Sequence, residues 1–240
     1  MKYWAVLDWS TDWDLNPGKR ICNPRRSRSD IRADIPAINK LYFNAPFKIL
    51  SQYFGCHHWL RITHVDVYMI SVSLPGTTPS SEYYDCRFAV LRAPLGFKRG
   101  AELLDDDNQA IHAWASLDKT VIAVGRAHLI PSNSDGAGSD HGGPGAVKIP
   151  GFGPLSTPSN RPAFQIRQMG TLENYRRQGL AAKVLTSLEE AAKTHLSAKA
   201  GFLQAREQAI GFYQSQGWQI IDEPYSIEGI GPHRSMMKKF

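Results

Sequence analysis

One segment, residues 163–195, constrains the fold more than any other part of this 240-residue chain. Residues 163–171 predict a strand. Residues 179–195 predict an amphipathic helix, because apolar side chains recur every three or four positions on one face. The connection between the two is basic and ends at Gly179. A strand, a basic loop and a helix N-terminus together favour anion binding, because unpaired N–H groups and the helix dipole attract negative charge.

The composition of this loop separates it from two common nucleotide sites. A P-loop requires Gly-Lys-Ser/Thr, which is absent here. A dinucleotide fold requires three spaced glycines and a later acidic residue, whereas Gly179 is the single glycine of this loop. Gly179 allows the backbone to approach a phosphate, and Arg176 and Arg177 can add charge-assisted hydrogen bonds.

Other periodic segments predict a chain of strands with few helices. Asp118-Lys119 is expected to form a tight hairpin turn, and Gly217 a left-handed helix cap. Further strands are expected at residues 65–72, 111–117, 120–130, 201–205, 218–221 and 234–239, and further helices at 81–91 and 207–216. Residues 131–162 hold seven glycines, six prolines and five serines, which predicts a flexible insertion without regular structure.

Residues 1–64 form an N-terminal extension to which the sequence assigns no role. Prolines recur about every ten residues, which leaves open whether the extension is ordered. The basic cluster between Lys19 and Arg32 favours a solvated segment over a nucleic-acid site. Cys56-His57-His58 has only His64 nearby, so we expect no metal site.

Composition restricts the class of protein. Hydrophobic residues make up 42% and charged residues 21%, as in soluble globular proteins, and no apolar run is long enough to predict a membrane span. Cys22, Cys56 and Cys86 form neither a disulfide framework nor a CxxC site. We therefore predict a cytoplasmic protein.

Three motifs resemble those of GNAT N-acetyltransferases. Residues 169–181 resemble the pyrophosphate motif Arg/Gln-x-x-Gly-x-Gly/Ala, with Ala181 at its last position. Residues 204–218 resemble the second acetyl-CoA segment, in which Phe-Tyr-x-x-x-Gly-aromatic ends a helix. Residues 223–236 look like the Gly-Ile-Pro-His…Met ending of the ElaA-like branch, here with Gly231 inserted. Residues 87–96 and 105–112 are similar to the front half of that branch.

The resemblance implies a fold, a domain and a co-substrate. The fold is α+β, with a mixed, mostly antiparallel central sheet that is flanked by helices and splayed at the acetyl-CoA site. Residues 65–240 would form this domain, interrupted by the insertion at 131–162. Acetyl-CoA would serve as co-substrate, without a metal ion. The residues implied to bind it are Met169, Thr171, Arg176, Arg177, Gln178, Gly179, Leu180, Ala181, Gln204 and Phe212.

The resemblance also implies direct acetyl transfer to a primary amine in a ternary complex. Tyr213 matches the tyrosine near the cofactor sulfur and would protonate the departing thiolate; its structural alternative is a core aromatic residue beside Phe212. His233 would act as the base, with packing as its alternative. Water and four other side chains remain open for the base: His112, for which packing is favoured, Glu173, Glu223 and Glu228.

Other functions remain open at the level of sequence. One alternative is a non-catalytic acyl-CoA-binding regulatory module, which the retained Tyr213 disfavours. A nucleic-acid-binding protein ranks last, because no recognition helix accompanies the basic cluster. The acceptor is expected to be a small-molecule or peptide amine, no membrane partner is expected, and a homodimer is open.

Overall fold

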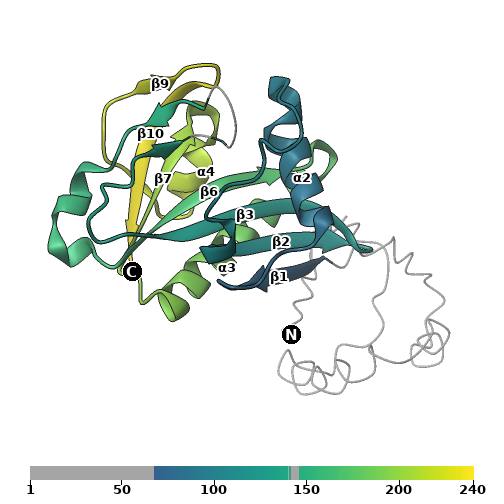
Figure 1. Cartoon of the computed structure of the whole chain (residues 1–240), viewed down its shortest axis with the longest axis horizontal. Coiled ribbons are helices and arrows are strands. Elements are labelled where there is room, and N and C mark those ends of the chain that lie inside the picture. The colour runs from purple at the N-terminus through teal and green to yellow at the C-terminus, as the bar shows by residue number, and fades with distance from the viewer. Residues whose placement is uncertain (1–67, 140, 142–145) are drawn as a thin grey trace, which may run out of the picture. The chain divides into compact units, whose positions relative to one another are not determined.

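The computed structural model describes residues 68–139, 141 and 146–240, which form a sheet with helices packed against it (Figure 1). Along the chain, α2 follows β1, α3 lies between β6 and β7, and α4 lies between β7 and β8. The main elements are β1 (Met69–Ser73), α2 (Ser81–Leu91), β2 (Ile111–Leu117), β3 (Thr120–Ile130), β6 (Ala163–Thr171), α3 (Leu180–His195), β7 (Ala200–Arg206), α4 (Ile210–Ser215), β8 (Gln219–Ile220), β9 (Tyr225–Ile227) and β10 (Gly231–Lys239).

The sheet is mixed and mostly antiparallel, as the resemblance implied. Its strand order is β1-β2-β3-β6-β7-β10-β8, and β9 pairs with β10. Neighbouring strands in the described sheet pair antiparallel except β6 and β7, which are parallel. The chain between these two parallel strands contains α3, so β6, α3 and β7 form one crossover unit.

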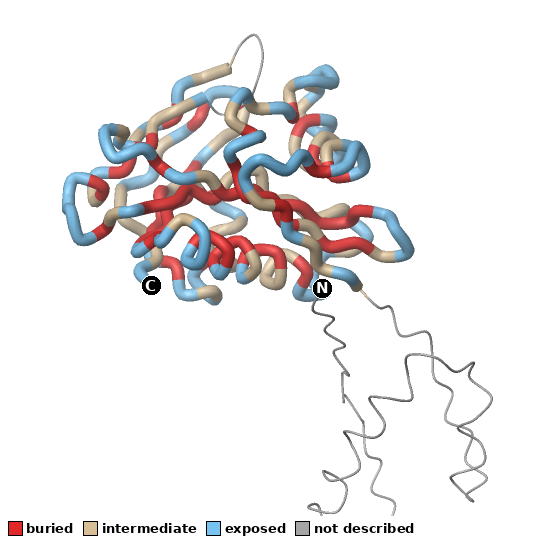
Figure 2. Tube along the Cα trace, turned by 60° about the horizontal axis from the view of Figure 1, so that its bottom comes forward, coloured by how far each residue is buried: buried red, intermediate tan, exposed pale blue. Residues whose placement is uncertain are grey.

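The helices cover opposite faces of the sheet. The predicted apolar stripe of α3 is confirmed, because Leu180, Val184 and Leu188 are buried against β2 and β3 side chains in the largest core cluster. On the other face, a Cβ built on Gly170 of β6 would lie 2.4 Å from Val90 Cγ2 of α2, so the helix packs directly on the strand. Figure 2 shows the buried residues running along the sheet and the helix beneath it.

Several local predictions are confirmed. Strands β2, β3 and β6 have the predicted bounds, and α2 begins after Ser80. Asp118 and Lys119 have φ angles of +46° and +70°, which is the conformation that a two-residue hairpin turn requires. Gly217, with φ +85°, follows α4 as the predicted left-handed residue.

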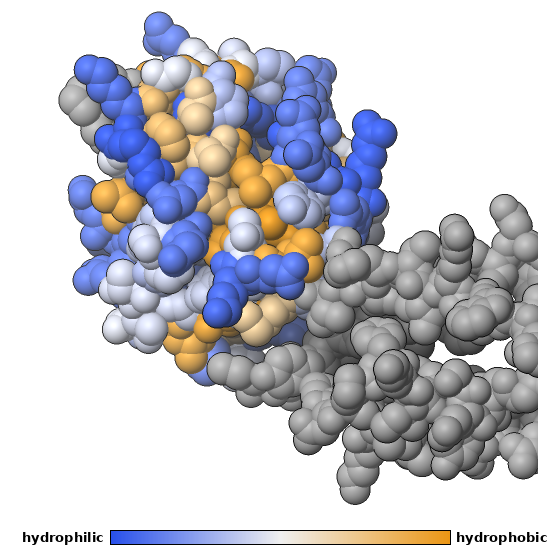
Figure 3. Space-filling model, turned by 90° about the vertical axis from the view of Figure 1, so that its right-hand side faces the viewer, coloured by the Kyte–Doolittle hydropathy of each residue, from blue (hydrophilic) through white to orange (hydrophobic). Residues whose placement is uncertain are grey.

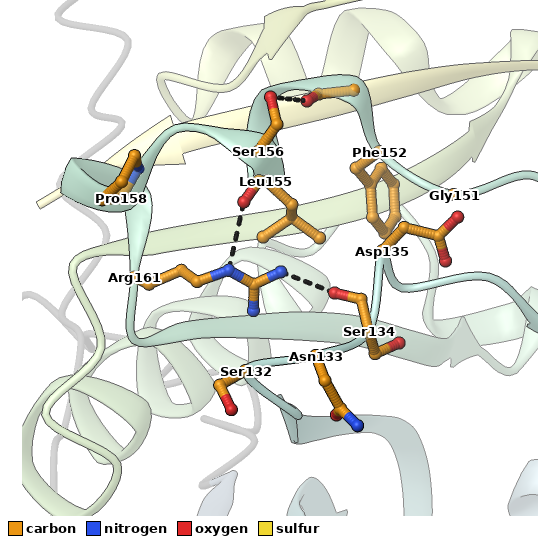
Figure 4. A pocket seen from close by; sticks show the side chains of 11 residues that line it. Ser132, Asn133, Ser134, Asp135, Gly151, Phe152, Leu155, Ser156, Pro158 and Arg161 are labelled. Atoms are coloured by element: carbon orange, nitrogen blue, oxygen red, sulfur yellow. Dashed lines mark hydrogen bonds between the residues drawn. The ribbon is translucent and has the colours of Figure 1, made fainter.

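The prediction for residues 131–162 is wrong in part. Its described portion contains the strands β4 (Gly138–Ser139) and β5 (Lys148–Ile149) and two 3-10 helices, Gly153–Ser156 and Pro158–Asn160. Phe152 and Leu155 are buried in a core cluster with β7 and β10 side chains. Arg161 donates hydrogen bonds to the carbonyl oxygens of Leu155 and Ser134 (Figure 4). It also donates to the carbonyl oxygen of Pro131, which ties both ends of the segment together. Glycine and proline content therefore did not prevent ordering.

Element ends differ elsewhere. The strand expected at residues 65–72 corresponds to β1, which spans Met69–Ser73 in the described part of the chain. The helix expected at 207–216 begins as a 3-10 turn before α4. β9 was not predicted, and β10 begins at Gly231 rather than at Arg234. The predictions for residues 1–64 lie outside the described residues. None of the helices in the described part is long and apolar enough to cross a membrane.

Candidate active site

The strands β6 and β7 separate from each other along their length. They pair at residues 163–165 with residues 200–202, and beyond these pairs β6 is paired with β3 alone, through residues 166, 167, 170 and 171. A bulge in β6 accompanies the separation, because Gly125 of β3 faces both Gln168 and Met169, and Gln168 has φ +56°. A bulge bends a strand and increases its twist. The result is an opening in the sheet whose edges are two strand backbones.

The loop after β6 leads to the N-terminus of α3 with backbone donors exposed. Gly179 precedes the helix with φ +73°, and a Cβ built there would find no atom within 4 Å. The N–H groups of residues 178–182 donate to no other residue that the structure describes, and no side chain caps the helix. Arg177, with φ +63°, and Arg176 are exposed beside them. These groups form a surface that suits phosphate oxygens.

The two strands that border the opening, β6 and β7, end at the same edge of the sheet. Because β6 and β7 are parallel, the loop after β6 and the helix α4 after β7 lie at the same end. Tyr213 of α4 and Leu180 of α3 belong to one buried cluster, against which Met169, Leu172 and Phe212 also pack. The structure thus brings the predicted phosphate loop and the predicted catalytic tyrosine to one end of the opening.

Tyr213 is part of the core and retains a proton. Its ring lies 6.2 Å from that of Trp218 and 5.0 Å from that of Phe212, in edge-on arrangements. Its hydroxyl makes no hydrogen bond to another residue of the described part of the chain. Burial raises the pKa of the Tyr213 phenol well above its ordinary value. The side chain is thus an undissociated phenol whose hydroxyl has no hydrogen-bond partner among the described residues.

His233 lies on β10 as a neutral imidazole. Its Nδ1 is 2.8 Å from the carbonyl oxygen of Gly231, which can only accept, so Nδ1 carries the proton and Nε2 can accept one. Burial, with a further contribution from Arg206, lowers the pKa of His233 below its ordinary value. His233 pairs with Arg206 in the sheet register and stacks on Tyr225 at 6.3 Å.

The other candidate bases are less suited than His233 to accept a proton. Both ring nitrogens of His112 are engaged, Nδ1 with the Tyr83 hydroxyl at 3.1 Å and Nε2 with the Asp107 carbonyl oxygen at 2.8 Å. Burial lowers the pKa of His112 to about 4. These contacts agree with a packing role. The carboxylates Glu173, Glu223 and Glu228 are exposed.

The remaining predicted cofactor residues lie along the opening or its loop. Thr171 Oγ1 is buried without a hydrogen-bond partner in the described structure, while the Thr171 carbonyl accepts from Arg176 Nε at 3.3 Å. Gln178 accepts a hydrogen bond from the Tyr68 hydroxyl. Gln204 of β7 accepts from Gln165 of β6 at 2.8 Å, where the two strands begin to part. Ala181 is half-buried in the first turn of α3.

Two cavities lie apart from these residues in the chain. The larger, of about 620 Å³, is lined by residues of the 132–161 segment, Arg161 among them (Figure 4). The Arg161 side chain already bonds three carbonyl groups. The smaller, of about 330 Å³, lies between β1 and α3. Neither is lined by a predicted site residue.

Figure 3 shows the side that carries α2 in Figure 1, where an apolar area lies between hydrophilic margins.

Comparison with known sequences identifies the family to which the chain belongs. Residues 77–218 match the acetyltransferase (GNAT) family, which is more than half of the chain. The chain belongs to the GNAT acetyltransferase family. The matched residues include the opening, the loop before α3 and Tyr213, and they end at Trp218. The GNAT acetyltransferase assignment made from the motifs is confirmed.

Two similar proteins are consistent with membership of this family. The Bacillus subtilis (strain 168) protein named uncharacterized N-acetyltransferase YitI is 35% identical over 98 aligned residues, covering 38% of this chain. The chain spans 62% of the length of that curated relative. The crystal structure of Escherichia coli ElaA matches with a TM-score of 0.51 at 18% identity, over 71% of this chain and 100% of that chain. This likeness confirms the GNAT fold.

No group of three or more potential metal ligands occurs among the residues that the structure describes. The sequence motif Cys56-His57-His58 lies outside them.

Proposed function

We propose that this GNAT protein is an acetyl-CoA-dependent N-acetyltransferase that transfers the acetyl group directly to a primary amine in a ternary complex. One observation carries the proposal: the opening between β6 and β7 ends beside a helix N-terminus with unpaired N–H groups. An extended thioester chain can lie against the strand backbones while its pyrophosphate meets residues 176–181. The unpartnered Thr171 Oγ1 and the open space at Gly179 fit such an occupant.

Acetyl-CoA supplies an activated acyl group, and the residues of this chain supply orientation and protons. The amine nitrogen attacks the thioester carbonyl, the new C–N bond forms, and the C–S bond breaks. The amine loses a proton to a base, for which His233 Nε2 is available, and the thiolate takes one from Tyr213. Backbone N–H groups near Met169 and Thr171 would stabilise the negative oxygen.

Tyr213 would act as a general acid that keeps its proton until the thiolate forms. In water a phenol, with a pKa near 10, is a weaker acid than a thiol, with a pKa near 8.5. Burial raises the pKa of Tyr213 further, so the phenol stays protonated until negative charge develops on the departing sulfur.

The test is release of free thiol from acetyl-CoA in the presence of a panel of amines, followed by mass spectrometry of the acceptor. We expect acceptor-dependent release with one acetyl group added to nitrogen. Binding of acetyl-CoA without release for any amine would instead support the non-catalytic acyl-CoA-binding module. A cytoplasmic location and a homodimer remain predictions.

A further inference from the structure

The face of the sheet opposite α3 carries an arginine on each side of the opening. Phe164 and Ile166 of β6 belong to the core cluster under α3, so the alternate residues Gln165 and Arg167 face the other way. Gln165 bonds Gln204 of β7 at 2.8 Å, which places that side chain on the same face. Two residues further along their strands, Arg167 and Arg206 therefore flank the opening.

Positive charge on this face exceeds the carboxylates available to balance it. Asp107 Oδ1 lies 3.0 Å from Arg87 Nη1 and 2.7 Å from Arg126 Nε, and Asp106 Oδ1 lies 2.5 Å from Arg126 Nη2. Both carboxylates are thus engaged by deeper guanidinium groups. No carboxylate in the described structure forms an ion pair with Arg167.

Burial and the neighbouring arginine Arg126 both affect the titration of this face. Burial, with a further contribution from Arg126, lowers the pKa of Arg167 to about 10. The same causes lower the pKa of His128 to about 3. In the sheet register Arg126 pairs with Arg167, and His128 pairs with Gln165, so all four side chains share one face. An anion on this face would be stabilised.

The 131–162 segment holds this face in place. Arg167 donates a hydrogen bond to the Ser139 carbonyl oxygen in β4. Gln204 Nε2 donates to the Pro150 carbonyl oxygen at 3.0 Å, and the Phe152 ring lies 5.1 Å from that of Phe202. Arg167 is therefore oriented by a carbonyl group, and none of the described carboxylates forms an ion pair with it.

We propose that the acceptor is a small amine that also carries a carboxylate, and that Arg167 binds this carboxylate beside the opening between β6 and β7. The proposal rests on the proposed function and names its substrate class. A guanidinium presents paired N–H donors that match the two oxygens of a carboxylate. Positive surroundings also favour the neutral form of the amine, which is the form that attacks the thioester.

The experiment compares each of the amino acids with its α-amide and with the corresponding decarboxylated amine, using acetyl-CoA and thiol detection. For the wild-type protein we expect kcat/KM to be about 10–100-fold higher for the acid than for its amide, as for one charged hydrogen-bonded contact. In Arg167→Gln this ratio should fall toward one, mainly through a higher KM for the acid. Arg167→Lys should lie between the two.

A matched control is Arg99→Gln. Arg99 is an exposed arginine paired with Asp85 and Glu102, so its loss should leave the acid-to-amide ratio unchanged. Thermal stabilisation by acetyl-CoA should persist in all three variants, which separates this inference from the proposed function. Equal turnover of acids and amides, preference for uncharged amines, or an unchanged ratio in Arg167→Gln would overturn it. Absence of acetyl-CoA binding by the wild type would refute the proposed function itself.

Discussion

Replacement of Tyr213 by phenylalanine separates catalysis from packing. The substitution keeps the ring contacts with Phe212 and Trp218 and removes one hydroxyl. Because this hydroxyl has no hydrogen-bond partner in the described structure, the free energy of unfolding should change by less than about 1 kcal/mol. If the hydroxyl protonates the thiolate, kcat should fall by roughly 10²–10⁴-fold. The Kd for acetyl-CoA should hardly change, because the interaction forms as the C–S bond breaks.

The assay is steady-state thiol release at saturating acetyl-CoA, with urea unfolding on the same samples. Tyr83→Phe is the control, since that buried hydroxyl donates to the Gly125 carbonyl oxygen at 3.1 Å. Tyr83→Phe should lose about 1 kcal/mol or more of stability, with kcat retained. A Tyr213→Phe protein with wild-type kcat would show that Tyr213 is a core residue only.

Two further predictions concern stability and domain boundaries. Burial lowers the pKa of His112 from 6.5 to about 4, so the unfolded chain binds the extra proton and stability falls as pH drops through that window. Burial likewise lowers the pKa of His128, to about 3, so the two histidines act in the same direction. We expect the free energy of unfolding by urea to be about 4 kcal/mol lower at pH 5 than at pH 7, with about half of this from each histidine; a flat profile would contradict this. We also expect a chain that begins at His64 to fold and to be stabilised by acetyl-CoA, because every recognised motif lies downstream. Insoluble protein, or protein without a thermal shift, would show that the N-terminal extension is required.

Local periodicity predicted much of the fold because the strongest elements lie in a continuous core. The alternation of residues 111–117, the Asp118-Lys119 turn and the stripe of α3 are each decided by near neighbours in sequence. The parallel pairing of β6 with β7 and the separation of these strands depend on residues 35 or more positions apart. No short-range pattern encodes the bulge at Gln168, where a non-glycine residue adopts φ +56°.

The 131–162 segment shows where composition misleads. Its glycines and prolines predicted flexibility, but Arg161 bonds three carbonyl groups and Phe152 packs on Phe202. These contacts are long-range and depend on single side chains. The same reason explains why Arg167 was not singled out from sequence: its significance comes from the register with Arg126 and from the carbonyl of Ser139. The alternation of the polar residues Gln165 and Arg167 with the apolar Phe164 and Ile166 in β6 was the one available signal.

The central claim, that the α3 N-terminus holds the pyrophosphate of acetyl-CoA, is tested most directly by comparing two glycines. Gly179 and Gly96 have φ angles of +73° and +75°, and a Cβ at either would meet no atom within 4 Å. Leucine at either position should therefore introduce similar backbone strain. Gly96 ends a 3-10 helix that contains no predicted site residue.

The measurement is calorimetric titration with acetyl-CoA, supported by the melting temperature at a ligand concentration about 100 times the Kd. For the wild type and Gly96→Leu we expect binding and stabilisation by about 2.7 kcal/mol, which corresponds to a shift of roughly 5–10 °C. Gly179→Leu should show neither binding nor a shift, because its side chain would project into the space for the phosphate. Equal affinity in both variants would contradict the assignment of this loop.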